Sequence, residues 1–188
     1  MSVALFDKPA FSSSVAHGII LGTDGRKMSK HLGNYPELEQ VFNTQGSDPV
    51  RLYLLGSSLF SGETAAFDAQ ALQEAQRNLV QRLGNSASFF NMYANVDGWQ
   101  PPKTLEAPSS NHLLDEWILA RLDVAIAEVT KAAEDYNTPP LVKSLFELVD
   151  DVSNWYIRRS RRRFWKTQDD SDKQSAYHTL WYVLLRTA

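Results

Sequence analysis

The chain has 188 residues, of which 43% are hydrophobic, a formal net charge of −3 and no cysteine. It is long enough for one large or two small domains with a real core, and it can form no disulfide, thiolate nucleophile or thiolate zinc site. Because the whole chain is weakly acidic, any binding to nucleic acid needs a local basic patch.

The sequence indicates neither a membrane segment nor a metal site. Its first residues lack the basic, apolar and small segments of a secretion signal, and no run approaches the ~20 apolar residues of a membrane helix. The four histidines are widely separated in the chain. We therefore expect a soluble, cytoplasmic protein with no membrane partner and no metal ligands.

The first predicted element is a buried strand that turns sharply into a lysine-containing loop. The strand is the apolar run 15–21, and the loop spans residues 24–34 with a glycine near each end. In the loop, Lys27 and Lys30 flank the small hydroxyl residue Ser29. Two ammonium groups on flexible stems can follow a phosphate as its charge develops. The loop favours phosphoryl or nucleotidyl chemistry, although composition alone also fits a solvated basic turn.

Helices are predicted for most of the remaining chain, from apolar residues spaced three and four apart. Two of them have clear N-cap candidates, Asp48 and Asp68. The predicted helices cover residues 36–42, 49–55, 68–96, 110–138, 141–163 and 170–188, with a connector at 101–110. Since the last helix meets no stop signal, we expect the chain to end inside an element of a longer protein.

The helix predicted from residue 141 has an apolar row that leads into arginine. The row passes through Val152 and Tyr156 and, at the same spacing, reaches Arg159 and Arg163. Either the helix projects past its neighbours, or these two guanidiniums are buried and paired with carboxylates.

Residues 155–166 form the second candidate site. They hold six of the nineteen lysines and arginines, interleaved with four aromatic residues, which suits an RNA backbone with exposed bases. The candidate RNA contacts are Trp155, Arg158, Arg159, Arg161, Arg162, Arg163 and Lys166. The alternative is an ordinary solvated helix face. A membrane-surface helix is disfavoured, because flanking acidic residues would repel anionic lipid.

Lys27-Met28-Ser29-Lys30-His31 resembles the signature loop of class I aminoacyl-tRNA synthetases, which usually ends in serine. The resemblance implies that these five residues bind ATP, which carries Mg²⁺ in the full-length enzyme. It also implies that Lys27 and Lys30 are catalytic and that Lys30 stabilises the pyrophosphate as the aminoacyl-adenylate forms. His31 replaces only the last hydroxyl, and an imidazole can also donate to a phosphate.

The run 153–161, Ser-Asn-Trp-Tyr-Ile-Arg-Arg-Ser-Arg, is similar to one in the isoleucine-specific members of this class. There it lies on a helix of the anticodon-binding domain, and the similarity extends over nearly the whole chain. It implies tRNA(Ile), ATP and isoleucine as partners of a monomeric full-length enzyme. Synthetases for methionine, valine and leucine share the loop and the helical domain but match the arginine run less well; they remain alternatives.

Other parts of a class I synthetase have no counterpart in the sequence, including the His-x-Gly-His element of the nucleotide-binding fold. We therefore expect a fragment that is inactive alone and binds no cofactor through its own residues. Two further hypotheses are a non-catalytic tRNA-binding module that kept the loop and a helical protein-interaction domain.

The expected fold is mainly α. Residues 1–62 should form a small α/β segment that ends the catalytic domain and carries the lysine loop. Residues 63–188 should form an antiparallel helical bundle, the anticodon-binding domain, truncated at its C-terminus. As part of the intact enzyme, the chain would serve ATP-dependent attachment of isoleucine to tRNA.

Overall fold

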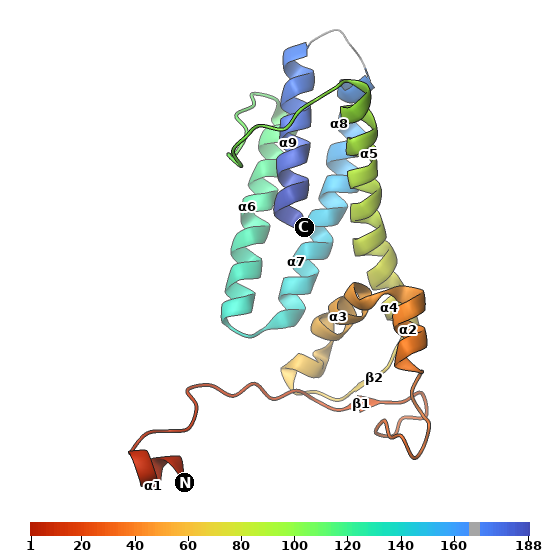
Figure 1. The fold of residues 1–188 in the computed structure, drawn as a ribbon, viewed down its shortest axis with the longest axis vertical. Coiled ribbons are helices and arrows are strands. Elements are labelled where there is room, and N and C mark those ends of the chain that lie inside the picture. Colours follow the sequence, from red (N-terminus) through yellow and green to blue (C-terminus); the bar gives the residue numbers. More distant parts are fainter. Residues whose placement is uncertain (166–169) are drawn as a thin grey trace.

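Long helices that run side by side form the upper part of the molecule (Figure 1). The computed structural model describes residues 1–165 and 170–188. Its bundle consists of α4 (Ala69–Ala75), α5 (Arg82–Val96), α6 (Leu113–Glu134), α7 (Thr138–Asp150), α8 (Arg158–Trp165) and α9 (Asp170–Thr187). Successive long segments run in opposite directions, so the predicted antiparallel bundle is confirmed.

A smaller part lies below the bundle and carries the lysine loop (Figure 1). It contains α1 (Ser2–Phe6), β1 (Ile20–Leu21), α2 (Leu38–Gln45), α3 (Ser47–Gly56), a 3₁₀ turn (Ser58–Ser61) and β2 (Ala65–Ala66). The two strands pair in parallel, Ile20 with Ala65 and Leu21 with Ala66. The strand is shorter than predicted because β2 offers it only two partners, and the chain before it lies extended and exposed. The mainly α fold with a small α/β segment is confirmed.

The starts of the helices follow local capping rules only in part. Asp68 caps α4 as predicted, since its side chain accepts hydrogen bonds from the amides of Gln70 and Ala71, at 2.8 and 3.2 Å. The predicted cap at Asp48 is wrong: α3 begins at Ser47, two residues earlier than predicted, and Asp48 instead forms an exposed ion pair with Arg51.

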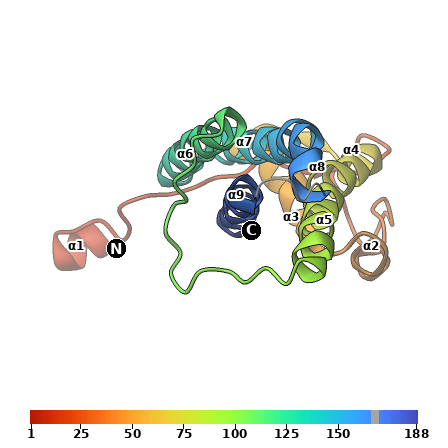
Figure 2. The same cartoon turned by 90° about the horizontal axis from the view of Figure 1, so that it is seen from above.

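Helix α9 lies between the other long helices and is the centre of the core (Figure 2). The row predicted for it, Ala176, Leu180 and Leu184, is buried. The connector before α6 crosses this helix and is tied to it, because the Trp99 ring stacks on Tyr177 with centroids 5.8 Å apart. Burial of these aromatic faces fixes the last helix in place without a sheet to support it.

Two wide turns interrupt the regular helices. Residues Gln76–Gln81 join α4 to α5, and Asp151–Ile157 join α7 to α8, both as π-helix, in which hydrogen bonds span five residues instead of four. After Tyr156 the buried row therefore advances by four to Ser160 and Phe164, both 0% exposed. Arg159 is exposed, so the alternative of burial and pairing does not hold for this residue.

Two kinds of feature are absent from residues 1–165 and 170–188. No helix there combines the length and the apolar character needed to cross a bilayer. No three His, Cys, Asp or Glu side chains in the same residues are grouped so that they could hold a metal ion.

Candidate functional sites on the lysine loop and the arginine helix

The lysine loop starts as a tight reversal of the chain after β1. Leu21 and Lys27 form an antiparallel bridge, and the Gly22 N–H donates to the carbonyl oxygen of Arg26 at 2.8 Å. A side chain on Gly22 would place its Cβ only 2.2 Å from the carbonyl oxygen of Asn34. The end of the strand therefore needs glycine, so that the two ends of the loop can meet.

Asn34 holds the loop together, a role that the sequence analysis missed. Its Oδ1 accepts from the Ser29 N–H at 2.9 Å, and its Nδ2 donates to Asp24 Oδ1 at 2.9 Å. The same Nδ2 is within 3.4 Å of the Arg26 carbonyl oxygen and 3.3 Å of the Lys27 carbonyl oxygen. The hydrogen bond from Asn34 also lowers the pKa of Asp24. The side-chain amide of Asn34 thus holds the loop both before Lys27 and between the two lysines.

The two lysines lie on the outside of this fixed loop. Lys27 and Lys30 are exposed, and neither forms an ion pair within the part of the chain that the structure describes. Met28 is half-buried and lines a hollow of about 380 Å³ beneath the loop. The exposed His31 donates its backbone N–H to Ser29 Oγ at 3.3 Å. Two uncompensated cations therefore face solvent from an anchored backbone.

We expect Asn34→Ala to loosen the loop without unfolding the bundle. The Ser29 amide loses its acceptor, so its hydrogen exchange should accelerate by about an order of magnitude, as expected for a lost bond of 1–2 kcal/mol. Peptide-level exchange measurements over residues 22–34 check this. Asn43→Ala, an exposed change on α2, is the matched control; equal exchange in both variants would contradict the role of Asn34.

The arginines of α8 divide into an exposed set and one buried member. The exposed set, called the arginine face here, consists of Arg158, Arg159, Arg161 and Arg162. Beside them on the surface, Trp155 and Trp165 are 48% and 51% exposed. Lys166, the last predicted contact, lies outside the described residues.

Aromatic rings lie under two members of the arginine face. The guanidinium carbon of Arg159 is 4.2 Å from the centroid of the Trp155 ring, and that of Arg161 is 5.9 Å from the Phe89 ring on α5. Trp155 in turn contacts Trp117 of α6, with centroids 6.4 Å apart. Such cation–π contacts restrict the long side chains, so part of the basic surface is pre-organised.

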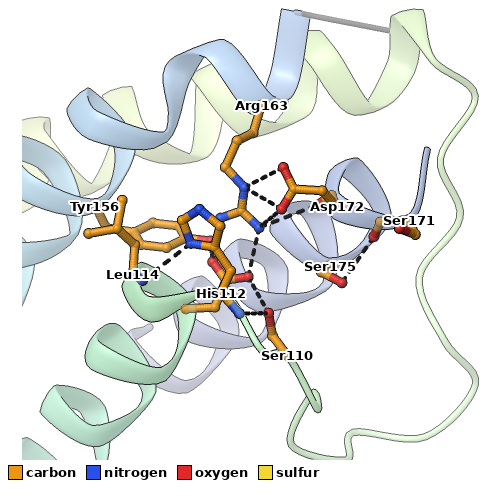
Figure 3. A network of polar contacts seen from close by, with 9 residues as sticks. Ser110, His112, Leu114, Tyr156, Arg163, Ser171, Asp172 and Ser175 are labelled. Carbon is orange, nitrogen blue, oxygen red and sulfur yellow. Dashed lines mark hydrogen bonds and ion pairs between the residues drawn. The ribbon is translucent and has the colours of Figure 1, made fainter. Parts of the chain in front are cut away.

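Arg163 points into the bundle, where it is the hub of a polar network (Figure 3). Its Nη1 and Nη2 donate to the two carboxylate oxygens of Asp115 at 2.6 and 2.8 Å, and its Nε donates to Asp172 at 2.9 Å. Asp115 also accepts from Tyr156 at 2.6 Å and from Ser110 at 2.7 Å. Of the two alternatives for Arg163, burial and pairing with carboxylates is the one that the structure shows, so its guanidinium is used within the fold.

Burial and charge act together on this network. Burial by itself raises the pKa of Asp115, but hydrogen bonds from Arg163, Tyr156 and Ser110 outweigh it and leave the pKa below its ordinary value. Burial and the neighbouring carboxylate of Asp115 raise the pKa of Tyr156 well above its ordinary value. The buried charges are thus present as a compensated pair with a neutral tyrosine beside it.

The acidic residues next to the arginine face are paired with other arginines. Asp150 forms an ion pair with Arg82 of α5 and accepts from Asn154 at 2.7 Å. Asp151 accepts from Arg121 of α6 at 2.7 Å. These carboxylates are therefore held away from the arginine face, which keeps its positive charge.

Family comparisons cover both candidate sites. Residues 1–67, which include the lysine loop, match the family described as tRNA synthetases class I (I, L, M and V). Residues 115–188, which include the arginine face, match the anticodon-binding domain of tRNA ligase. Two separate parts of the chain are thus similar to tRNA synthetases, the first to the class I family and the second to the anticodon-binding domain.

Isoleucine–tRNA ligases are among its relatives. The chain is 36% identical to that of Treponema denticola over 195 residues, 39% to that of Chlamydia pneumoniae over 184, and 37% to that of Protochlamydia amoebophila over 185. Each comparison covers 98% of this chain but 18% of the relative. The chain therefore spans about a fifth of the length of these proteins.

Solved structures of two tRNA synthetases share the fold. Methionyl-tRNA synthetase of Mycobacterium tuberculosis, in complex with methionyl-adenylate, superposes with a TM-score of 0.70 at 23% identity, over 92% of this chain and 34% of that one. A LeuRS of Agrobacterium radiobacter, in a ternary complex with tRNA and LeuAMS, superposes with a TM-score of 0.64 at 18% identity. The superposition covers 91% of this chain and 20% of that one. At these identities the likeness concerns the fold alone.

Proposed function

We propose that the chain is the part of an isoleucine–tRNA ligase that carries the lysine loop and the anticodon-binding helices. The observation that carries this proposal is 36–39% identity to isoleucine–tRNA ligases over 98% of the chain. In the complete enzyme, the isoleucine carboxylate attacks the α-phosphate of ATP and pyrophosphate leaves. The isoleucyl group of the resulting isoleucyl-AMP is then transferred to a hydroxyl of tRNA, and AMP leaves.

The lysine loop would act on the phosphates of ATP. Lys30 and Lys27 have no carboxylate partner among the described residues, so both charges are available to the departing pyrophosphate. Met28 lines the hollow beside the loop, and Ser29 and His31 would shape the turn between the lysines. Mg²⁺ bound to ATP would add charge stabilisation, while this chain contributes the two ammonium groups.

The arginine face would hold tRNA. Its members are exposed, unpaired with carboxylates in the described residues and placed on one helix of the domain that matches the anticodon-binding family. Guanidinium groups suit phosphates because they can donate two parallel hydrogen bonds. We leave Arg163 out of this surface, since its donors already contact Asp115 and Asp172.

Amino-acid-dependent exchange of pyrophosphate into ATP tests the assignment. The full-length protein should catalyse exchange with isoleucine much faster than with methionine, valine or leucine at equal concentration. If exchange were faster with methionine, valine or leucine, the chain would instead be assigned to the synthetase for that amino acid. Binding of tRNA with no exchange for any amino acid would favour a non-catalytic tRNA-binding module.

Neutralising single members of the arginine face should weaken tRNA binding with little effect on folding. We expect Arg158→Gln, Arg161→Gln and Arg162→Gln each to lower affinity and to reduce the slope of log K against log salt by up to about one unit. The midpoint of thermal unfolding should barely move, because these side chains are exposed. Filter binding of tRNA(Ile) at four salt concentrations measures both quantities.

Arg186→Gln provides a matched control, because Arg186 is an exposed arginine near the end of α9 and outside the arginine face. It should leave affinity and salt slope unchanged. If the three variants on α8 behave like this control, the helix does not contact tRNA phosphates, and the tRNA part of the proposal fails.

A further inference from the structure

Among the described residues of the arginine face, Arg159 has the shortest distance to an aromatic ring beneath its guanidinium, since Arg161 lies 5.9 Å from the Phe89 centroid. The distance from its guanidinium carbon to the Trp155 centroid is 4.2 Å. Neither Arg158 nor Arg162 has such a ring under it within the described residues. The guanidinium of Arg159 is therefore held close to the Trp155 ring, whereas those neighbours are free to follow a charge.

Trp155 is itself fixed by the bundle. Its ring contacts Trp117 of α6 at a centroid distance of 6.4 Å and an angle of 49° between the planes, and Trp117 packs against the core. Trp155 remains 48% exposed even so. Trp117 lies beside the ring and Arg159 over it, and the exposed guanidinium of Arg159 is still open to a ligand.

No carboxylate in the described residues competes for Arg159. The two nearest acids along its own helix, Asp150 and Asp151, are occupied by Arg82 and Arg121. An exposed guanidinium that stacks on an indole and lacks a counter-ion has a charged edge for phosphate and a planar face for a π-system. A lysine at the same position would offer the charge without the plane.

We propose that Arg159, positioned by Trp155, is a stacking platform for an unpaired base of the tRNA. This inference rests on the proposed tRNA function and deepens it: Arg158, Arg161 and Arg162 hold phosphates, and Arg159 takes a base. Proteins recognise RNA chiefly at unpaired nucleotides, whose faces stack on aromatic rings and on guanidinium planes. An unpaired base fits the open face of Arg159, whereas a paired stem keeps its bases stacked inside the helix.

The test compares lysine substitutions in the full-length ligase. Arg159→Lys keeps the charge and loses the plane, so affinity for tRNA(Ile) should fall about tenfold while the salt slope stays the same. Arg162→Lys, one turn further along the same face, should lose much less affinity for tRNA(Ile), because a lysine still pairs with phosphate. Trp155→Leu should reproduce the loss of Arg159→Lys, and the double variant should add nothing to either single change.

A second RNA separates stacking from charge. On a fully paired stem of the same length, without unpaired nucleotides, Arg159→Lys and wild type should bind equally well. Unchanged affinity for tRNA in Arg159→Lys would overturn the inference, and so would equal losses in Arg159→Lys and Arg162→Lys, which would mean that both arginines bind phosphate. These outcomes leave the proposed function standing, because it depends instead on the glutamine variants of the other three arginines.

Discussion

Replacing Lys30 by alanine in the full-length ligase is expected to lower the rate of isoleucyl-adenylate formation on the order of 10²-fold or more. The Lys30 ammonium is exposed on an anchored loop and forms no ion pair within the described residues, so its charge is available to the developing pyrophosphate. Under the proposed function this contact would form chiefly in the transition state, so isoleucine binding should change little. Single-turnover measurement of adenylate formation, with isoleucine affinity measured separately, checks the prediction.

Arg26→Ala is the control for this experiment. Arg26 is a cation of the same loop, but its guanidinium lies 3.6 Å from the carboxylate of Asp24. Its removal should leave the single-turnover rate close to that of wild type. An unchanged rate in Lys30→Ala would refute the role of Lys30. Equal losses in both variants would show that loop charge in general, and not Lys30 in particular, serves the reaction.

The second large effect concerns stability. Asp115→Asn should lower the free energy of unfolding by about 3–5 kcal/mol, because it leaves the buried Arg163 guanidinium with only part of its counter-charge. For a chain of this length we expect the midpoint of thermal unfolding to fall by about 10 °C. The Asp115 side chain is 0% exposed, so water cannot replace the lost charge. Calorimetry or circular dichroism of residues 1–188 measures the change.

Acid should reduce the difference in the midpoint of thermal unfolding between wild type and Asp115→Asn. The pKa of Asp115 is lowered in the folded state from the ordinary value of 3.8. The stability that its charge contributes is therefore present above pH 3.8 and is lost as pH falls through the folded-state pKa. Below that pH both chains carry a neutral side chain at this position, so their unfolding midpoints should converge.

Asp123→Asn, an exposed change on the same helix, should leave the free energy of unfolding nearly unchanged. The double variant Asp115→Leu with Arg163→Met should recover part of the lost free energy of unfolding. With both charges removed, no buried charge remains without its partner at these two positions. An Asp115→Asn protein as stable as Asp123→Asn would mean that Asp172 alone compensates Arg163.

Local rules explain which features could be predicted from the sequence. Asp68 was recognised as a cap because the amides that it binds lie two and three residues away. The lysine loop was recognised from adjacent residues for the same reason. The acceptor of Arg163 could not be predicted from the sequence, because Asp115 lies 48 residues away and only the assembled bundle brings the two together.

Asn34 shows a different limit. It was counted within the loop but not as a functional residue, because nothing in its type distinguishes it from other turn asparagines. Its role comes from four partners that the fold collects around one amide. Similarly, the exposure of Arg159 depends on the wide turn before it, and apolar spacing in the sequence did not indicate that turn.

The wide turn at Asp151–Ile157 also bears on how this protein family can change in length. A π turn is equivalent to an α-helix with one additional residue, so a deletion within it would restore ordinary helical bonding and keep the downstream helix facing the same way. A deletion within Arg158–Trp165 would instead rotate every later side chain by about 100° and turn a buried phenylalanine outward. Evolution can therefore gain or lose one residue before the arginines at little cost, whereas a gap among them would be selected against.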